Sequence, residues 1–162
     1  MTSNSPTRGR RPGNRRSELL ELAARLFAEN GLKSTTVRDI ADAAGILSGS
    51  LYHHFDTKEA MVDEILTGFL DDLFGSYEDI VASDTDARQR LEALIAVSFD
   101  AIHRHHSAVA IYQAEASKLA AQERFHYIGT RNAEFRTLWK DVLADGVATG
   151  LFRSDLDVEL VF

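Results

Sequence analysis

Proline is confined to the first twelve residues of this 162-residue chain, at Pro6 and Pro12. The 150 residues that follow contain none. Because proline lacks a backbone N–H and breaks helix interiors, so long a stretch without it favours helices throughout. Apolar residues recur at spacings of three and four, and no segment alternates apolar and polar residues with a period of two. The sequence therefore predicts an all-α protein.

Composition narrows the functions open to such a helical chain. With no cysteine, it cannot form disulfides, thiolate zinc sites or cysteine nucleophiles. Hydrophobic residues make up 44% and charged residues 27%, which is ordinary for a soluble globular protein. No apolar run is long enough to span a bilayer, and the N-terminus lacks the apolar stretch of a secretory signal. We expect a cytoplasmic protein with no cofactor and no membrane partner.

The net charge of -7 is unevenly distributed. Residues 1–60 carry a formal charge of +2, and residues 61–162 carry -9. The first sixteen residues contain five arginines and no acidic residue. We expect residues 1–13 to form a flexible Arg-rich arm, which is either a solvated tail or a contact to DNA phosphates or the minor groove. The basic N-terminal region keeps nucleic acid among the expected partners of an acidic chain.

Capping residues predict the first two helices. Ser17 has the character of an N-cap, and Gly31 follows the last apolar position of the first helix. Thr35 or Thr36 is then expected to cap a short second helix that stops at Gly45. These glycine and hydroxyl boundaries predict two helices joined by a short turn.

The remaining helices follow from similar signals. A third short helix is expected over residues 48–55. Asp56 and Glu59 have the spacing of a capping box for a long fourth helix, with Thr57 as a competing cap. Further helices are expected at about residues 87–105, 107–120 and 125–149, and another is expected to begin at Leu156 without being completed by this chain.

The segment 37–55 has the spacing of a helix-turn-helix motif. Two short helices that meet at a sharp angle need a small side chain where their axes approach, and the turn needs a residue that adopts positive φ. Ala41 and Gly45 meet these requirements. Ile40, Ile46 and Leu51 can then pack inward against the first helix. The opposite face of the third helix is left for the major groove of DNA.

The same segment resembles the signature of the tetracycline-repressor (TetR) family of transcription regulators. The matching positions are Thr35-Thr36, Ile40-Ala41, Gly45, Gly49, Leu51-Tyr52, His54-Phe55 and Lys58-Glu59. The resemblance implies a three-helix DNA-binding domain over residues 14–75, with the motif itself at about 37–56. It also implies a helical ligand-binding and dimerisation domain over residues 76–162, which we expect to be incomplete because the chain stops near the last two helices of the family's fold.

The resemblance also implies a set of residues that face DNA. Most of them would contact phosphate through hydroxyls, through a glycine that permits close approach, or through helix N-termini. The expected DNA-binding residues are Arg15, Arg16, Thr35, Thr36, Leu47, Ser48, Gly49, Ser50, Tyr52, His53, His54 and Lys58.

Leu47 departs from the family pattern, because the family usually has a serine cap there. Ser48 is a possible cap one residue later. Leu47 either contacts a thymine methyl or packs under the turn. Between Leu47 and His54 there is no Arg, Lys, Asn or Gln, the usual bidentate base readers. Sequence readout is therefore expected to depend on hydroxyls, histidine, apolar contacts and DNA shape.

Several segments beyond the motif resemble actinobacterial TetR-like repressors of late cholesterol-ring catabolism, which respond to a coenzyme A thioester. They are residues 44–55, 61–64, 111–115 and 155–158. This resemblance implies a repressor released from its operator by a steroid-derived acyl-CoA. A repressor of fatty-acid or other lipid metabolism that responds to fatty acyl-CoA is the alternative.

Such an inducer would occupy an apolar pocket among the fourth to seventh helices. The candidate lining residues are Phe69, Phe74, Phe99, Tyr112, Gln113 and Trp139, although aromatic residues at helical spacing are more often core. Basic residues available to a coenzyme A moiety are Arg104, Lys118, Arg124, Arg131 and Arg136.

We expect no enzymatic activity. A helical metal-dependent enzyme is a distant alternative that would use His103 and His106, which are expected to share a helix face. The expected mechanism is that of a homodimer whose two recognition helices lie about 34–36 Å apart on a pseudo-palindromic operator. Inducer binding would tilt the fourth helix and weaken DNA binding roughly 5- to 150-fold.

Overall fold

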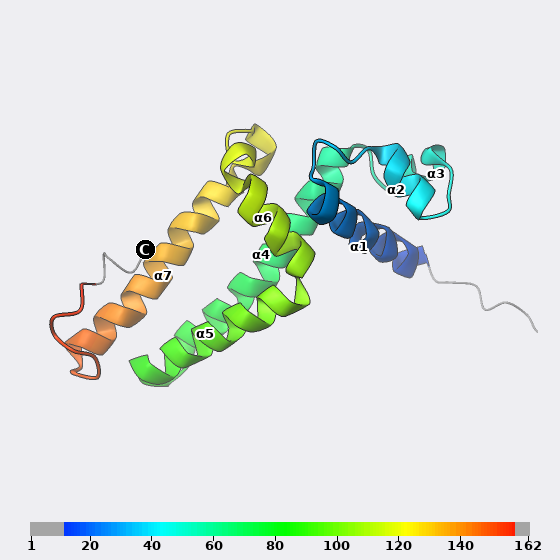
Figure 1. The fold of residues 1–162 in the computed structure, drawn as a ribbon. Coiled ribbons are helices and arrows are strands. Elements are labelled where there is room, and N and C mark those ends of the chain that lie inside the picture. Colours follow the sequence, from blue (N-terminus) through cyan, green and yellow to red (C-terminus); the bar gives the residue numbers. More distant parts are fainter. Residues whose placement is uncertain (1–11, 158–162) are drawn as a thin grey trace, which may run out of the picture. The chain divides into compact units, whose positions relative to one another are not determined.

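The computed structural model describes residues 12–157, which are mainly helical and contain no strand (Figure 1). The all-α expectation is therefore confirmed for this range. The chain divides into two compact units, unit 1 over Met1–Ile65 and unit 2 over Leu66–Phe162. The expected boundary at residues 75/76 lies ten residues further along the same helix, α4 (Lys58–Ala82). Most of the expected N-terminal arm, and the helix expected to continue beyond Leu156, fall outside the described residues.

Unit 1 contains α1 (Pro12–Asn30), α2 (Val37–Ala43), α3 (Ser48–Tyr52) and the start of α4. Helix α2 packs against both α1 and α3. The expectation that Ser17 caps the first helix is wrong, because α1 begins at Pro12 and Ser17 lies inside it. A proline in the first turn costs no helical hydrogen bond, so the helix tolerates the residue that was expected to precede it.

The core of unit 1 comes from the apolar positions expected to point inward. Ile40, Ala41 and Leu51 are fully buried, together with Leu19 and Phe27 of α1. Ile46 is only partly buried. The turn between α2 and α3 has Gly45 at φ +66°, which confirms the reason for a glycine at this position. Burial of one face of α3 leaves its other face at the surface.

Two of the competing caps are decided by the structure. Thr36 caps α2, where its side chain accepts from Asp39 N and the Asp39 carboxylate accepts from Thr36 N. Thr57 rather than Asp56 caps α4, since Ala60 N donates to Thr57 Oγ1 at 3.0 Å. The capping box expected from Asp56 and Glu59 is therefore wrong, because the helix begins one residue later than that pairing requires.

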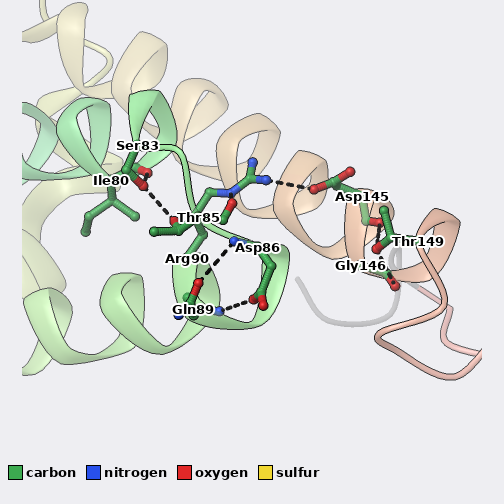
Figure 2. Close-up of polar contacts among 9 residues, drawn as sticks. All are labelled: Ile80, Ser83, Thr85, Asp86, Gln89, Arg90, Asp145, Gly146 and Thr149. Carbon is green, nitrogen blue, oxygen red and sulfur yellow. Dashed lines mark hydrogen bonds and ion pairs between the residues drawn. The ribbon is translucent and has the colours of Figure 1, made fainter.

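Unit 2 contains the rest of α4, α5 (Ala87–Arg104), α6 (His106–Leu119), a short 3-10 helix η1 (Glu123–Phe125) and α7 (Tyr127–Ala148). Helix α5 packs against α6 and α7. Asp86 and Gln89 form a capping box at the start of α5, and Arg90 donates to Asp145 of α7 at 2.9 Å (Figure 2). The buried residues of the unit include Leu66, Tyr77, Leu94, Ile111, Phe125, Ile128 and Val142.

The chain breaks its helix at His105, between α5 and α6. His103 and His106 therefore lie on different helices, and the expectation that they share one helix face is wrong. His105 itself pairs with Asp72. The described residues contain no group of three or more His, Cys, Asp or Glu side chains that is placed to hold a metal ion. No helix within residues 12–157 is long and apolar enough to cross a membrane.

Candidate nucleic-acid interface

The outer face of α3 exposes hydroxyl-bearing residues and a glycine, with the apolar Leu47 directly before them. Gly49, Ser50 and Tyr52 are exposed and Ser48 is partly so, while Leu51 between them is fully buried. His53 and His54 follow directly after the helix, and His53 is exposed. We call the set Leu47, Ser48, Gly49, Ser50 and Tyr52 the reading surface. Its composition of hydroxyls and a glycine suits close approach to a DNA backbone.

Thr36 lies at the exposed N-terminus of α2. Its hydroxyl donates to the Asp39 carboxylate at 2.7 Å and accepts from Asp39 N at 3.2 Å. The hydrogen bonds that the Thr36 hydroxyl and backbone N–H donate to the Asp39 carboxylate lower the pKa of Asp39, so the carboxylate stays ionised and holds the cap. The capping box fixes the direction in which α2 starts.

Thr35 is in a different environment from its neighbour. Its side chain is buried at 1% exposure, and its hydroxyl donates to Leu26 O and Gly31 O. Thr35 therefore closes the loop between α1 and α2 and has no surface to offer a phosphate. The sequence alone left Thr35 and Thr36 as equivalent hydroxyls, and only the packing of the loop separates their roles.

Lys58, at the start of α4, is bonded within unit 1. Its ammonium donates to Leu32 O at 2.7 Å and to Thr35 O at 3.2 Å. These two carbonyls belong to the loop that leads to the Thr36 cap. In this structure Lys58 supports the loop, and its expected contact to phosphate remains a prediction.

Arg15 and Arg16 also bind other parts of unit 1. Arg15 donates to Ala44 O at 3.1 Å, at the end of α2. Arg16 forms a forked ion pair with Glu64 of α4 and stacks over the Phe55 ring, 4.5 Å from its centroid. The hydrogen bond with Glu64 is the main cause of a raised pKa for Arg16. The pair connects the start of α1 with α4, so both arginines have positioning roles here.

Leu47 is the N-cap residue of α3 and makes no side-chain capping bond. It is 80% exposed, which contradicts the alternative in which it packs under the turn. Ser48 lies inside the helix, so the expectation that it caps α3 is also wrong. The helix also ends at Tyr52, earlier than the expected Phe55.

Sequence reasoning did not include Arg38 or Glu64. Arg38 follows the Thr36 cap on α2, and its side chain is 83% exposed, with a 3.7 Å ion pair to Asp42. Its position in the first turn beside Thr36 was the available signal. Glu64 had no such signal, because its partner Arg16 lies 48 residues earlier in the chain.

Two of the aromatic residues expected to line a ligand pocket, Phe69 and Phe74, are core residues of unit 2. Phe74 contacts Tyr77, and Tyr77 contacts both Phe135 and Trp139 with ring centroids about 6 Å apart. We call Phe74, Tyr77, Phe135 and Trp139 the aromatic core. Tyr77 is 1% exposed and its hydroxyl lies 2.7 Å from Ser98 Oγ. Burial raises the pKa of the Tyr77 phenol, which stays protonated.

The other candidate ligand residues are dispersed. Phe69 is buried and its ring contacts Tyr112, whose hydroxyl donates to Asn132 at 2.7 Å. Burial raises the pKa of Tyr112 as well. Gln113 is exposed, and Phe99 is 70% exposed on α5. The six candidates therefore differ widely in burial, and their role as ligand contacts remains a prediction.

An open groove of about 450 Å³ lies elsewhere in unit 2. Val81 of α4 and one face of α7 form its walls. Its lining residues are Val81, Thr130, Ala133, Glu134, Thr137, Leu138 and Asp141, none of which was an expected ligand residue.

Three of the basic residues considered for a coenzyme A moiety are paired with carboxylates within the unit. Lys118 pairs with Glu115 at 3.1 Å. Arg104 pairs with Asp72 and Asp100. Arg131 pairs with Asp71 and Glu134, and lies over the Phe74 ring at 4.7 Å. An anionic ligand would have to compete with these carboxylates.

Comparison with known proteins agrees with both halves of this description. The family model described as "Bacterial regulatory proteins, tetR family" matches residues 19–65, and "Tetracyclin repressor-like, C-terminal domain" matches residues 84–162. The first match spans most of α1, all of α2 and α3, and the start of α4. The second match spans α5 to α7.

Individual relatives are close in sequence. The chain is 68% identical to the HTH-type transcriptional repressor KstR2 of Rhodococcus jostii, over 91% of this chain and 72% of the relative. It is 61% identical to the repressor of the same name from Mycobacterium tuberculosis, over 92% and 74%. The solved structure of the ketosteroid transcriptional regulator KstR2 of Mycobacterium tuberculosis matches with a TM-score of 0.89 and 62% identity, over 91% of this chain and 75% of that one.

Proposed function

The chain belongs to the tetR family of bacterial regulatory proteins, and from this premise we propose that it represses steroid catabolism genes by binding an operator, from which a steroid-derived acyl-CoA releases it. The observation that carries the DNA-binding part is the reading surface. Hydroxyls and a glycine line the exposed face of a short helix whose other face is anchored by the fully buried Leu51. Relatives at 61–68% identity that bear the name of a transcriptional repressor support the repressor role.

The contacts to DNA are mostly to phosphate. Thr36, Ser48 and Ser50 offer hydroxyls, Gly49 allows the backbone of α3 to approach closely, and Tyr52 offers an exposed phenol. His53 and His54 follow at the end of the helix. Because such contacts carry little sequence information, the spacing of two copies on a pseudo-palindromic operator supplies much of the specificity.

The protein acts as a homodimer whose two recognition helices are separated by about 34–36 Å or a near multiple. Helix α4 begins in unit 1 and continues into unit 2 along the chain. A ligand that binds unit 2 changes the direction of α4 and favours a helix spacing that no longer fits the operator. The coupling lowers DNA affinity by roughly 5- to 150-fold.

The steroid part of the inducer is supported by the related solved structure, which is that of a ketosteroid transcriptional regulator. Apolar surface in unit 2 is available for a ring system, since Ile95, Phe99 and Ile102 are exposed along α5. A fatty acyl-CoA is the competing inducer, and it would use the same apolar surface.

The test begins by enriching bound duplexes from a random-sequence pool and measuring affinity for the enriched duplex by fluorescence anisotropy. Steroid-derived acyl-CoAs, fatty acyl-CoAs and free coenzyme A are then titrated into the complex. We expect release by a steroid acyl-CoA at concentrations that saturate the protein in calorimetry. Release by fatty acyl-CoA alone would establish the alternative inducer, and a failure to enrich any sequence would overturn the operator-binding function.

A further inference from the structure

Leu47 occupies an unusual position for an apolar side chain. It stands at the N-cap of α3 with 80% of its surface exposed. Among the described residues of unit 1, Leu47 and Tyr52 are the large hydrophobic side chains that are exposed, and both belong to the reading surface. The side chain therefore contributes little to the core beneath it.

Leu47 also lacks the side-chain hydrogen bond that an N-cap residue usually makes. N-cap positions favour Ser, Thr, Asp and Asn because their side chains accept a hydrogen bond from the first turn. Leu47 makes no such bond, and the neighbouring α2 shows what a capped start provides, with Thr36 and Asp39 bonded reciprocally. In the free protein, Leu47 neither caps the helix nor packs in the core. Its apolar side chain is therefore free to contact a binding partner.

The residues next to Leu47 indicate that this partner is DNA. Ser48, Gly49 and Ser50 suit phosphate and sugar contacts, and residues 48–53 contain no Arg, Lys, Asn or Gln for bidentate base reading. In the major groove of DNA the apolar group offered by a base edge is the C5-methyl of thymine. From this position we infer that Leu47 is a specificity-determining residue, which packs against a thymine methyl group in each half-site of the operator. The inference rests on the proposed function, since it names the base-reading contact of that same surface.

Leu47 then adds base discrimination to a surface that otherwise positions the protein on the backbone. Burial of one methyl group contributes about fourfold in affinity, so two half-sites together give about fifteenfold. Replacing thymine by deoxyuridine removes only this methyl and keeps the base pair. The substitution therefore isolates the contact.

The experiment uses the full chain and the duplex enriched by the wild-type protein. Each thymine is replaced in turn by deoxyuridine, symmetrically in both half-sites, and affinities are measured for wild type, Leu47→Ser and Leu47→Met. We expect one position at which wild type loses about fifteenfold. Leu47→Met should keep this sensitivity because it keeps an apolar side chain, and Leu47→Ser should lose it while binding the unmodified duplex more weakly.

Leu151→Ser is the matched control, because Leu151 is another exposed leucine and lies outside unit 1. It should show the wild-type pattern of sensitivity. Thermal unfolding of all variants checks folding, and the exposure of Leu47 predicts no loss of stability. The inference is overturned if no thymine methyl matters to the wild type, or if Leu47→Ser retains the full sensitivity. If no duplex is enriched at all, operator binding itself fails and the inference falls with it.

Discussion

In unit 1 the residues expected to bind DNA are, apart from the buried Thr35, exposed or partly exposed, whereas in unit 2 the residues expected to contact a ligand range from fully buried to exposed. Ser50 and Tyr52 are exposed on α3, with the buried Leu51 between them. In unit 2, Phe69 and Phe74 are buried, whereas Phe99 is 70% exposed and Gln113 is exposed. The expected DNA-binding side chains of unit 1 are thus accessible to a partner, whereas several large aromatic side chains of unit 2 are buried and stabilise its fold.

The contrast follows from what defines each site. A helix-turn-helix surface depends on residues a few positions apart, so the same spacing that buries Ile40 and Leu51 exposes their neighbours. A ligand pocket depends on gaps between helices that are distant in sequence, and an aromatic side chain fills such a gap as readily as it lines one. The following predictions test whether the two units differ in this way.

The largest effect is expected in the aromatic core. Tyr77→Ala removes a buried ring that contacts Phe74, Phe135 and Trp139, and should lower the free energy of unfolding of unit 2 by about 3–5 kcal/mol. Tyr77→Phe loses only the bond to Ser98 and should cost about 1 kcal/mol. Urea unfolding followed by fluorescence of Trp139, the single tryptophan, measures both. If Tyr77→Ala keeps full stability but abolishes acyl-CoA binding, the cluster is a pocket and the contrast between the units fails.

A glycine pair in unit 1 gives the next effect. Gly45 has φ +66°, so Gly45→Ala should cost about 1–2 kcal/mol through backbone strain alone, because an added Cβ meets no atom within 4 Å. Gly49 also has open space around its Cβ position, but it lies within α3 and does not adopt positive φ. Gly49→Ala should therefore keep or raise stability and weaken DNA binding.

Circular dichroism during thermal unfolding, together with anisotropy on the enriched duplex, separates the two variants. A Gly49→Ala protein that binds DNA as tightly as wild type would show that the backbone of α3 does not come close to the duplex. A Gly45→Ala protein with unchanged stability would contradict the role of the turn.

Sequence could define unit 1 further than unit 2 for the same physical reason. The buried positions Ile40 and Leu51 and the positive φ of Gly45 follow from local spacing, and all were predicted. The roles of Thr35 and Lys58 were not, because they depend on a loop whose carbonyls turn inward. The sequence alone does not predict whether the hydroxyl of Thr35 or the ammonium of Lys58 binds a DNA phosphate or a backbone carbonyl of the protein.

In unit 2 the helices were predicted closely but their partners were not. The break at His105 agrees with the helices expected over 87–105 and 107–120, and this break places His103 and His106 on different helices. Phe99 and Phe74 have the same residue type and similar helical settings, yet one is 70% exposed and the other is buried. Only the packing of the helices within the unit distinguishes them.

Lys58 provides a smaller effect that separates support of the loop from binding to phosphate. Lys58→Met removes the hydrogen bonds to Leu32 O and Thr35 O, and should cost about 1 kcal/mol of stability in unit 1. If Lys58 only supports the loop, the dependence of log affinity on log salt concentration stays that of wild type. Arg38→Met is the comparison, since Arg38 is exposed on α2. We expect Arg38 to contact a phosphate in each half-site, so the substitution removes two arginine–phosphate interactions from the dimer and should make the slope shallower by about two. A shallower slope for Lys58→Met would restore the expected binding of Lys58 to phosphate.

The smallest effect concerns the charged cluster at the surface of unit 2. Asp72 accepts from His105 Nε2 at 2.9 Å and from Arg104, and Arg104 also pairs with Asp100. The hydrogen bond from His105 is the main cause of a pKa of Asp72 lowered from the ordinary value of 3.8, followed by the bond from Arg104. A folded-state pKa below the unfolded value stabilises the protein above that unfolded value, and the contribution is lost as pH falls through the folded one.

Asp72→Asn should therefore be slightly less stable than wild type at neutral pH, and the difference should shrink once the pH falls below about 4, as it approaches the lowered folded-state pKa of Asp72. The effect is small because solvent screens these half-exposed side chains. Unfolding followed through Trp139 between pH 3 and 7 measures it, with Asp79→Asn, an exposed carboxylate on the same helix, as the control. A stability difference that grows on acidification would mean that the folded-state pKa of Asp72 lies above its ordinary value. The hydrogen bonds from His105 and Arg104 would then not stabilise the ionised carboxylate.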